Sequence, residues 1–230
     1  MATLPTPTVA GLFHPVTPTS VAPIGTQTEP THPVPTAVPA ATATPQPLKE
    51  LPIYDEQLRK NWSLANSDGM TFALDEAHVV SSGKVAAKIT PTKDFGMLFF
   101  TVRKQSNEEY LRKQVLGVKF WLNSGPNGIR TSDLAVTVVG SNDFPYWVND
   151  DTSVKVTGRV TQDLPLFSET RLYFLGINRD IEPNTWVEVD LWLDDNQYDP
   201  DYTYVTGIYI KNDKGFRGPF YIDRVSLITL

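Results

Sequence analysis

The sequence contains no cysteine and only three histidines. Without cysteine there can be no disulfide, thiolate metal site or cysteine nucleophile. The histidines are His14, His32 and His78, and a set this small excludes a serine-type triad and a histidine-rich zinc site. No phosphate-binding loop or dinucleotide fingerprint occurs. Two carboxylates would suffice for a glycosidase, so a hydrolase stays open only if a deep cleft holds such a pair.

Positive charge is also scarce. The 230 residues include 20 Lys and Arg against 26 Asp and Glu, a net charge of −6. Without a basic run to neutralise phosphates, nucleic acid is not an expected partner. No apolar run is long enough to span a membrane. Residues 1–11 lack both the charged start and the apolar centre of a signal peptide.

Charge is almost missing from residues 1–48, which contain a single charged side chain, Glu29. The same segment holds 11 of the 19 prolines and 11 threonines. Proline fixes φ and removes an N–H donor, so we predict an extended arm here and a folded domain over residues 49–230. Because Pro/Thr-rich spacers are typical of exported proteins, we expect an extracellular or cell-surface location. A pure spacer does not need apolar residues such as Leu12 and Phe13. The alternative is therefore that the arm docks on a neighbouring copy or on a surface protein.

After residue 48, short segments alternate apolar and polar side chains. Period-two stretches rich in Val, Ile, Phe, Tyr and Trp indicate strands, and Gly/Asn/Asp-rich turns separate them. The predicted strands are 84–90, 96–102, 115–122, 134–139, 170–176, 186–193, 205–211 and 220–227. One short helix is predicted at 106–114. Eight to ten antiparallel strands predict an all-β fold, which is a two-sheet sandwich or a barrel.

Alternation also assigns faces to two of these strands. The rows that contain Val189 and Phe120 are apolar and belong between the sheets. The opposite rows mix tryptophan with charge, which an ordinary solvent face does not require. Their members are Trp186, Glu188, Asp190 and Trp192 on one strand, and Lys119 and Trp121 on the other.

Several segments resemble jelly-roll modules attached to secreted bacterial glycoside hydrolases. Ile53-Tyr54-Asp55-Glu56, followed by Trp62, is similar to the opening strand of such modules. Residues 117–122 and 184–189 are similar to inner strands. The segment Phe-Tyr-Ile-Asp-Arg-Val-Ser-Leu at 220–227 resembles the last strand of galactose-binding-like domains. The resemblance spans about residues 50–230 and implies a non-catalytic carbohydrate-binding jelly roll. Because structural surface proteins share this fold, an assembly subunit of a surface layer or filament is the alternative.

Sugar binding needs aromatic rings beside polar groups, because a pyranose has an apolar face and a rim of hydroxyls. The candidate ligand-binding residues for a polysaccharide or glycan are Trp121, Trp186, Trp192, Glu188 and Asp190 on the strands, and Tyr146, Trp147, Tyr198 and Tyr202 in the loops. The alternative is that the strand tryptophans cover a sheet edge or an arm and that the loop tyrosines close the ends of the sandwich.

The resemblance also implies a structural calcium ion between the first and last strands. It would be held by Asp55 or Glu56 together with Asp223, since Ca²⁺ takes six to eight oxygen ligands. The alternative is that Asp223 pairs with Arg224 or with a lysine.

Overall fold

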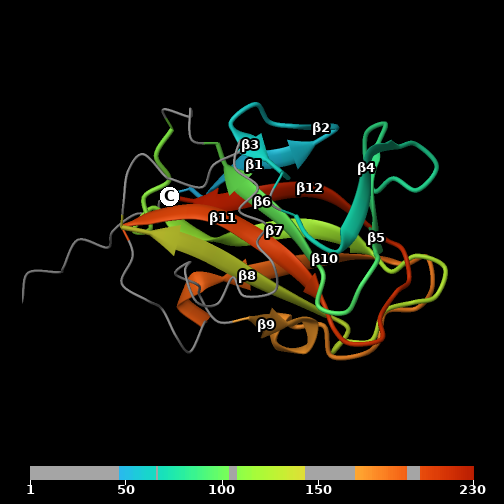
Figure 1. The fold of residues 1–230 in the computed structure, drawn as a ribbon. Coiled ribbons are helices and arrows are strands. Elements are labelled where there is room, and N and C mark those ends of the chain that lie inside the picture. The colour runs from blue at the N-terminus through green and yellow to red at the C-terminus, as the bar shows by residue number, and fades with distance from the viewer. Residues whose placement is uncertain (1–46, 66, 104–107, 143–168, 196–202) are drawn as a thin grey trace, which may run out of the picture. The chain divides into compact units, whose positions relative to one another are not determined.

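The computed structural model describes residues 47–65, 67–103, 108–142, 169–195 and 203–230. Their strands form two antiparallel sheets that face each other (Figure 1). The predicted all-β, two-sheet sandwich is therefore confirmed. The predicted arm lies outside the described residues. No helix in these ranges is long and apolar enough to cross a membrane.

The larger sheet, here called sheet A, has seven strands. They are β1 (Lys49–Asp55), β2 (Gln57–Leu58), β4 (Met70–Glu76), β5 (Ala86–Pro91), β7 (Val115–Asn123), β10 (Trp186–Trp192) and β12 (Phe220–Thr229). Their order is β10–β7–β12–β1–β2, with β5 also pairing with β12, and β4 with β5.

The smaller sheet, sheet B, has five strands. They are β3 (Trp62–Ser63), β6 (Met97–Val102), β8 (Leu134–Ser141), β9 (Thr170–Arg171) and β11 (Tyr204–Asn212). They lie in the order β3–β6–β11–β8–β9.

The core lies between the sheets and is built by alternate residues of each strand. Phe120 and Val189 from sheet A are fully buried there, as are Phe100 and Ile208 from sheet B. The inward rows predicted from alternation are therefore confirmed.

Sheet B also buries side chains on its outer face. Phe99 and Tyr209 pair across β6 and β11 and meet edge to face, with ring centroids 6.0 Å apart. Met97 and Val139 complete this second apolar cluster. The Tyr209 hydroxyl donates to Glu169 Oε1 at 2.7 Å, so the phenol has a polar partner despite its burial.

Two predicted elements were wrong. Only Thr170–Arg171 of the strand predicted at 170–176 is extended, and Leu172–Leu175 forms a 3₁₀ helix, η1. Leu172 and Leu175, three residues apart, both pack on the core, which suits a period of three rather than two. Residues 108–114 of the predicted helix form no helix, because one turn leads directly into β7.

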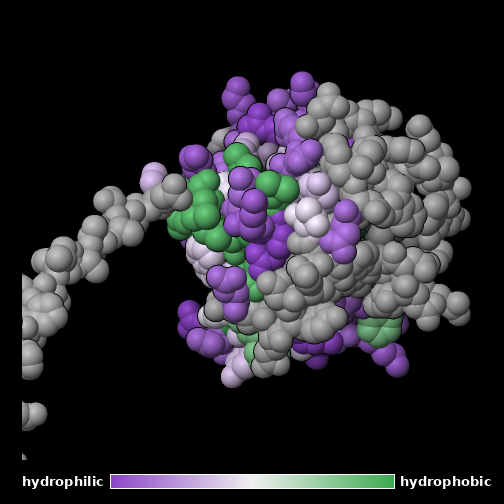
Figure 2. All heavy atoms as spheres, turned by 90° about the vertical axis from the view of Figure 1, so that its left-hand side faces the viewer, coloured by the Kyte–Doolittle hydropathy of each residue, from purple (hydrophilic) through white to green (hydrophobic). Residues whose placement is uncertain are grey.

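Figure 2 looks onto the end of the sandwich where the C-terminus lies, and apolar surface gathers there among hydrophilic side chains. The ends of β1 and β12 meet at this place, with Lys49 opposite Thr229. Leu48 and Leu230, the residues just beyond this pair, are exposed, as is Leu51. The chain therefore enters its folded part beside an apolar patch.

The turn after β7 provides a test of the packing. Gly125 has φ 65°, and a Cβ there would lie 2.0 Å from the carbonyl oxygen of Pro219. Gly176 has φ 82° with nothing within 4 Å of a Cβ. We expect Gly176→Ala to lower the free energy of unfolding by about 1–3 kcal/mol through backbone strain alone. Gly125→Ala should lower it further, because a backbone clash is added. Equal losses in urea denaturation would contradict the close approach of this turn to Pro219.

Candidate functional site

The outer face of sheet A carries the strand residues singled out from the sequence. β10 lies antiparallel on β7, with Glu188 opposite Trp121 and Asp190 opposite Lys119. The residue between the two acids, Val189, is fully buried in the core. Because successive side chains on a strand point to opposite faces, the two pairs lie on the outer face.

Three tryptophans mark this face and are here called the tryptophan row: Trp186, Trp121 and Trp192. Each is partly exposed. Trp186 and Trp192 are six residues apart on β10, about 20 Å at roughly 3.4 Å per residue. Trp121 comes from β7, level with a point between them. The row is therefore long enough to contact several rings of a chain-like ligand rather than a single ring.

Gly117 lies opposite Trp192 on β7 and is buried. A Cβ at Gly117 would lie 2.5 Å from the carbonyl oxygen of Leu191, so close strand packing requires glycine here. Ile228 of β12 lies on the other side of Gly117. The β7 and β10 backbones therefore lie close together beside Trp192.

A lysine ties three strands together on this face. Lys119 Nζ lies 2.6 Å from Glu188 Oε1 on β10 and 3.5 Å from Glu50 Oε1 on β1. The hydrogen bond that Lys119 donates to Glu188 raises the pKa of Lys119, burial lowers it, and the charges of the nearby carboxylates raise it further. Lys119 therefore stays charged and holds both carboxylates in place.

Asp190 is the least satisfied polar group on the face. Its Oδ1 is buried and has no hydrogen-bond partner among the described residues. Burial raises the pKa of Asp190, the Lys119 charge lowers it, and Glu188 and Glu50 raise it. A buried acceptor without a donor costs free energy. It is suited to a hydroxyl donor supplied by a ligand.

The loop candidates Tyr146, Trp147, Tyr198 and Tyr202 lie outside the described residues. The structure therefore brings together only the strand half of the predicted set.

The three residues expected to hold calcium each lie near the junction of β1 and β12. Glu56 Oε1 accepts the Lys84 backbone N–H at 2.5 Å. Asp223 Oδ2 accepts the N–H groups of Ser81 and Ser82, both at 3.2 Å. In the described part of the chain, no three His, Cys, Asp or Glu side chains are grouped so as to hold a metal ion. Calcium binding at these residues stays a prediction.

Asp223 also has a neighbour that sequence reasoning missed. It lies opposite Trp121 across β12 and β7 and is almost fully buried. Burial raises its pKa, backbone N–H groups oppose the rise, and Asp55 adds to it. Glu50 itself was missed, because only the pairing of β1 with β12 brings it near Lys119. Alternation along β12 places Asp223 on the face opposite Phe220 and Ile222, but no local pattern indicates the position of Glu50.

No protein-family model and no curated protein matches this sequence. The fold is similar to solved carbohydrate-binding modules, and the predicted resemblance is confirmed as a likeness of structure. A family 29 module complexed with mannohexaose has a TM-score of 0.45 at 12% identity, over 80% of this chain and 94% of that one.

Two further structures show the same distant likeness. The family 11 module of a cellulosomal cellulase of Clostridium thermocellum has a TM-score of 0.44 at 14% identity, over 80% and 97% of the two chains. A family 29 module from Piromyces equi has a TM-score of 0.41 at 10% identity, over 80% and 91%. Values this low carry no argument about a ligand.

Asp190 gives a pH-dependent prediction. Its folded-state pKa lies above the ordinary value of 3.8, so its contribution to stability is present when it is protonated and is lost as pH rises through the folded pKa. We expect Asp190→Asn to be more stable than the parent at pH 7, with the difference shrinking toward pH 3. Chemical denaturation at the two pH values measures this. The control Glu188→Gln loses an exposed ion pair and should fall by at most about 1 kcal/mol at pH 7. A less stable Asp190→Asn at pH 7 would contradict the assigned environment.

Proposed function

We propose that this chain is a non-catalytic, extracellular carbohydrate-binding module of the jelly-roll type, which binds a glycan along the outer face of sheet A. The observation that carries the proposal is the tryptophan row beside Asp190, whose buried Oδ1 has no donor among the described residues. Aromatic rings stack on the apolar faces of sugar rings, and the carboxylates accept hydrogen bonds from the sugar hydroxyls.

The charge of the face favours a neutral glycan. Glu50, Glu188 and Asp190 surround Lys119, which is the partner of the first two. An acidic polysaccharide would bring its carboxylates or sulfates toward this excess of negative charge, which opposes binding. A neutral chain meets no such penalty.

The absence of catalysis is supported by the composition, since the chain has no cysteine and three histidines. The alternative of an assembly subunit depends on residues 1–48, which the structure does not describe in full. No described contact favours it, so the binding module is the function we put forward.

Loss of a ring from the tryptophan row should weaken binding. We expect Trp192→Ala and Trp121→Ala each to raise the Kd for a hexasaccharide about tenfold or more, equivalent to ~1.4 kcal/mol or more. Calorimetry with cellohexaose, mannohexaose and xylohexaose measures this. Phe174→Ala is the matched control, because Phe174 is 74% exposed on η1 and outside the row.

Two results would overturn the proposed function. One is that none of the three hexasaccharides binds the folded parent protein. The other is that Phe174→Ala weakens binding as much as the two tryptophan variants do, since the row would then have no special part in recognition.

Calcium is proposed separately, on the resemblance that placed Asp55, Glu56 and Asp223 at the junction of the first and last strands. If it binds there, the unfolding temperature should rise with millimolar CaCl₂ over EDTA, because a ligand that binds only the folded state stabilises it. The rise should vanish in Asp55→Asn. Identical unfolding temperatures in CaCl₂ and EDTA would show that no such site exists.

A further inference from the structure

We infer that one end of the sandwich carries a second saccharide site, a groove that binds a neutral sugar through its hydroxyl groups and without stacking. The groove has a volume of about 470 Å³ and lies between the loops at 125–133, 178–183 and 213–218. Its side chains include Asn127, Arg130, Asp180 and Arg217. Volumes of roughly 300–1,000 Å³ are usual for small-molecule sites.

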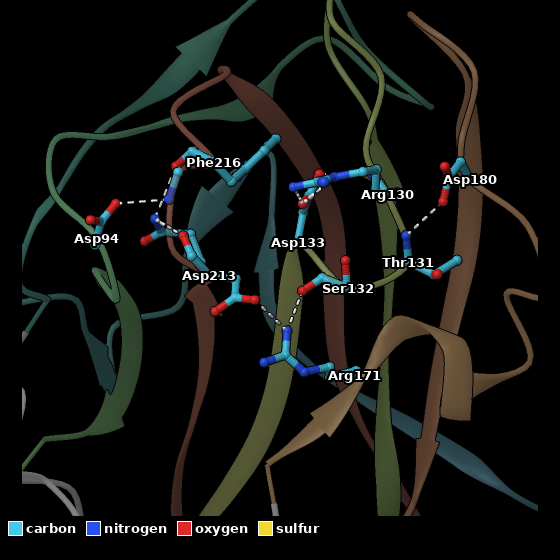
Figure 3. A network of polar contacts seen from close by, with 11 residues as sticks. Asp94, Arg130, Thr131, Ser132, Asp133, Arg171, Asp180, Asp213 and Phe216 are labelled. Carbon is cyan, nitrogen blue, oxygen red and sulfur yellow. Dashed lines mark hydrogen bonds and ion pairs between the residues drawn. The ribbon is translucent and has the colours of Figure 1, made fainter. Parts of the chain in front are cut away.

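The walls of the groove are held in place by the fold. Ile129 and Ile181 exchange backbone hydrogen bonds of 3.0 and 2.8 Å, which join two of its loops. Asp180 Oδ1 accepts the Thr131 N–H at 3.1 Å between the same loops. Figure 3 shows Asp180 directed toward Thr131 across this join. A site formed in advance loses less entropy when its ligand binds.

Arg130 is fixed by a carboxylate that is itself buried. Asp133 is 4% exposed, and its Oδ1 accepts Arg130 Nε at 2.9 Å and Nη2 at 2.8 Å. Its Oδ2 accepts the backbone N–H of Arg130 at 2.9 Å. Figure 3 shows the two side chains against each other. A guanidinium has five N–H donors, so donors remain for a ligand while the head group is held still.

Arg217 lies on another wall and pairs with a carboxylate that is itself partly exposed. Its Nη2 lies 2.9 Å from Asp94 Oδ1, and this oxygen also accepts the Gly215 N–H at 2.9 Å. The Arg130 and Arg217 side chains are 66% and 44% exposed, so both can contact a molecule in the groove. Two accessible guanidinium groups, each paired with a carboxylate, thus line one hollow.

The chemistry of the lining indicates the class of ligand. Two arginines and two aspartates, Asp133 and Asp180, leave it with no net charge, so an anion gains little. The one aromatic residue, Phe216, is 7% exposed and offers no ring face for stacking. The guanidinium donors and the exposed Asp180 carboxylate together match hydroxyl groups, which both donate and accept. A neutral saccharide has such hydroxyls at every ring.

The groove adjoins the proposed glycan face. Asn123, the last residue of β7, lies opposite Trp186, and the loop that forms one wall of the groove begins at the next residue. The groove is therefore at the Trp186 end of the tryptophan row. The inference rests on the proposed function for the class of ligand, and its geometry is independent of the row.

A ¹H–¹⁵N NMR titration of the full chain with cellohexaose, mannohexaose and xylohexaose separates the two sites. The amide signals of Gly128, Gly215 and Gly218 report on the groove, and the indole signals of Trp186 and Trp192 report on the row. We expect both sets to shift with at least one sugar. Trp192→Ala should keep the glycine shifts.

Arg217→Ala should keep the indole shifts and raise the Kd read from the glycine amides about tenfold or more. Its ion pair is exposed, so the fold should persist. Arg179→Ala, an exposed arginine outside the groove lining, is the matched control and should leave both sets unchanged.

The outcomes distinguish the two proposals. Indole shifts at saturation without glycine shifts overturn the groove and leave the row standing. Glycine shifts without indole shifts do the reverse. If neither the glycine amide signals nor the indole signals shift, both proposals are overturned. A loss in Arg179→Ala equal to that in Arg217→Ala overturns the groove, because general surface charge would then explain the binding.

Discussion

The register of β10 on β7 is the constraint on which the rest of this structure depends. With Val189 opposite Phe120, both strands bury their apolar rows between the sheets, and the tryptophans and charges of both strands share the outer face. A slip of one residue would exchange the two faces of β10. The core thus specifies the outer face, because the free energy of burying the apolar rows is far larger than any gain among the surface side chains.

On the outer face, stability and binding make opposite demands. Lys119 links β10, β7 and β1 through Glu188 and Glu50, which favours the folded sheet. Asp190 disfavours the folded sheet, because its buried Oδ1 has no hydrogen-bond donor among the described residues. A polar group that destabilises the free protein and could be satisfied by a ligand is typical of a binding site.

The two proposed sites use different physics on one rigid scaffold. The tryptophan row lies on strands, whose spacing is set by the sheet, and it would bind through ring faces. The groove lies on loops, and binding residues on loops are positioned by the scaffold that supports them. Here the Ile129–Ile181 pair and the buried Asp133 provide this support. Asn123 joins the two regions, since β7 ends there and the first groove loop follows.

The sequence by itself determined the all-β class and the two faces of β7 and β10, because period-two alternation is a local property that survives any packing of the strands. Only the tertiary structure decided which strands became neighbours. It brought Glu50 to Lys119, set Asp223 beside Trp121, and gathered Arg130 and Arg217 around one groove. It also made Leu172–Leu175 a 3₁₀ helix, because Leu172 and Leu175, three residues apart, both pack on the core. These outcomes depend on contacts between residues distant in the chain, and no local pattern encodes them.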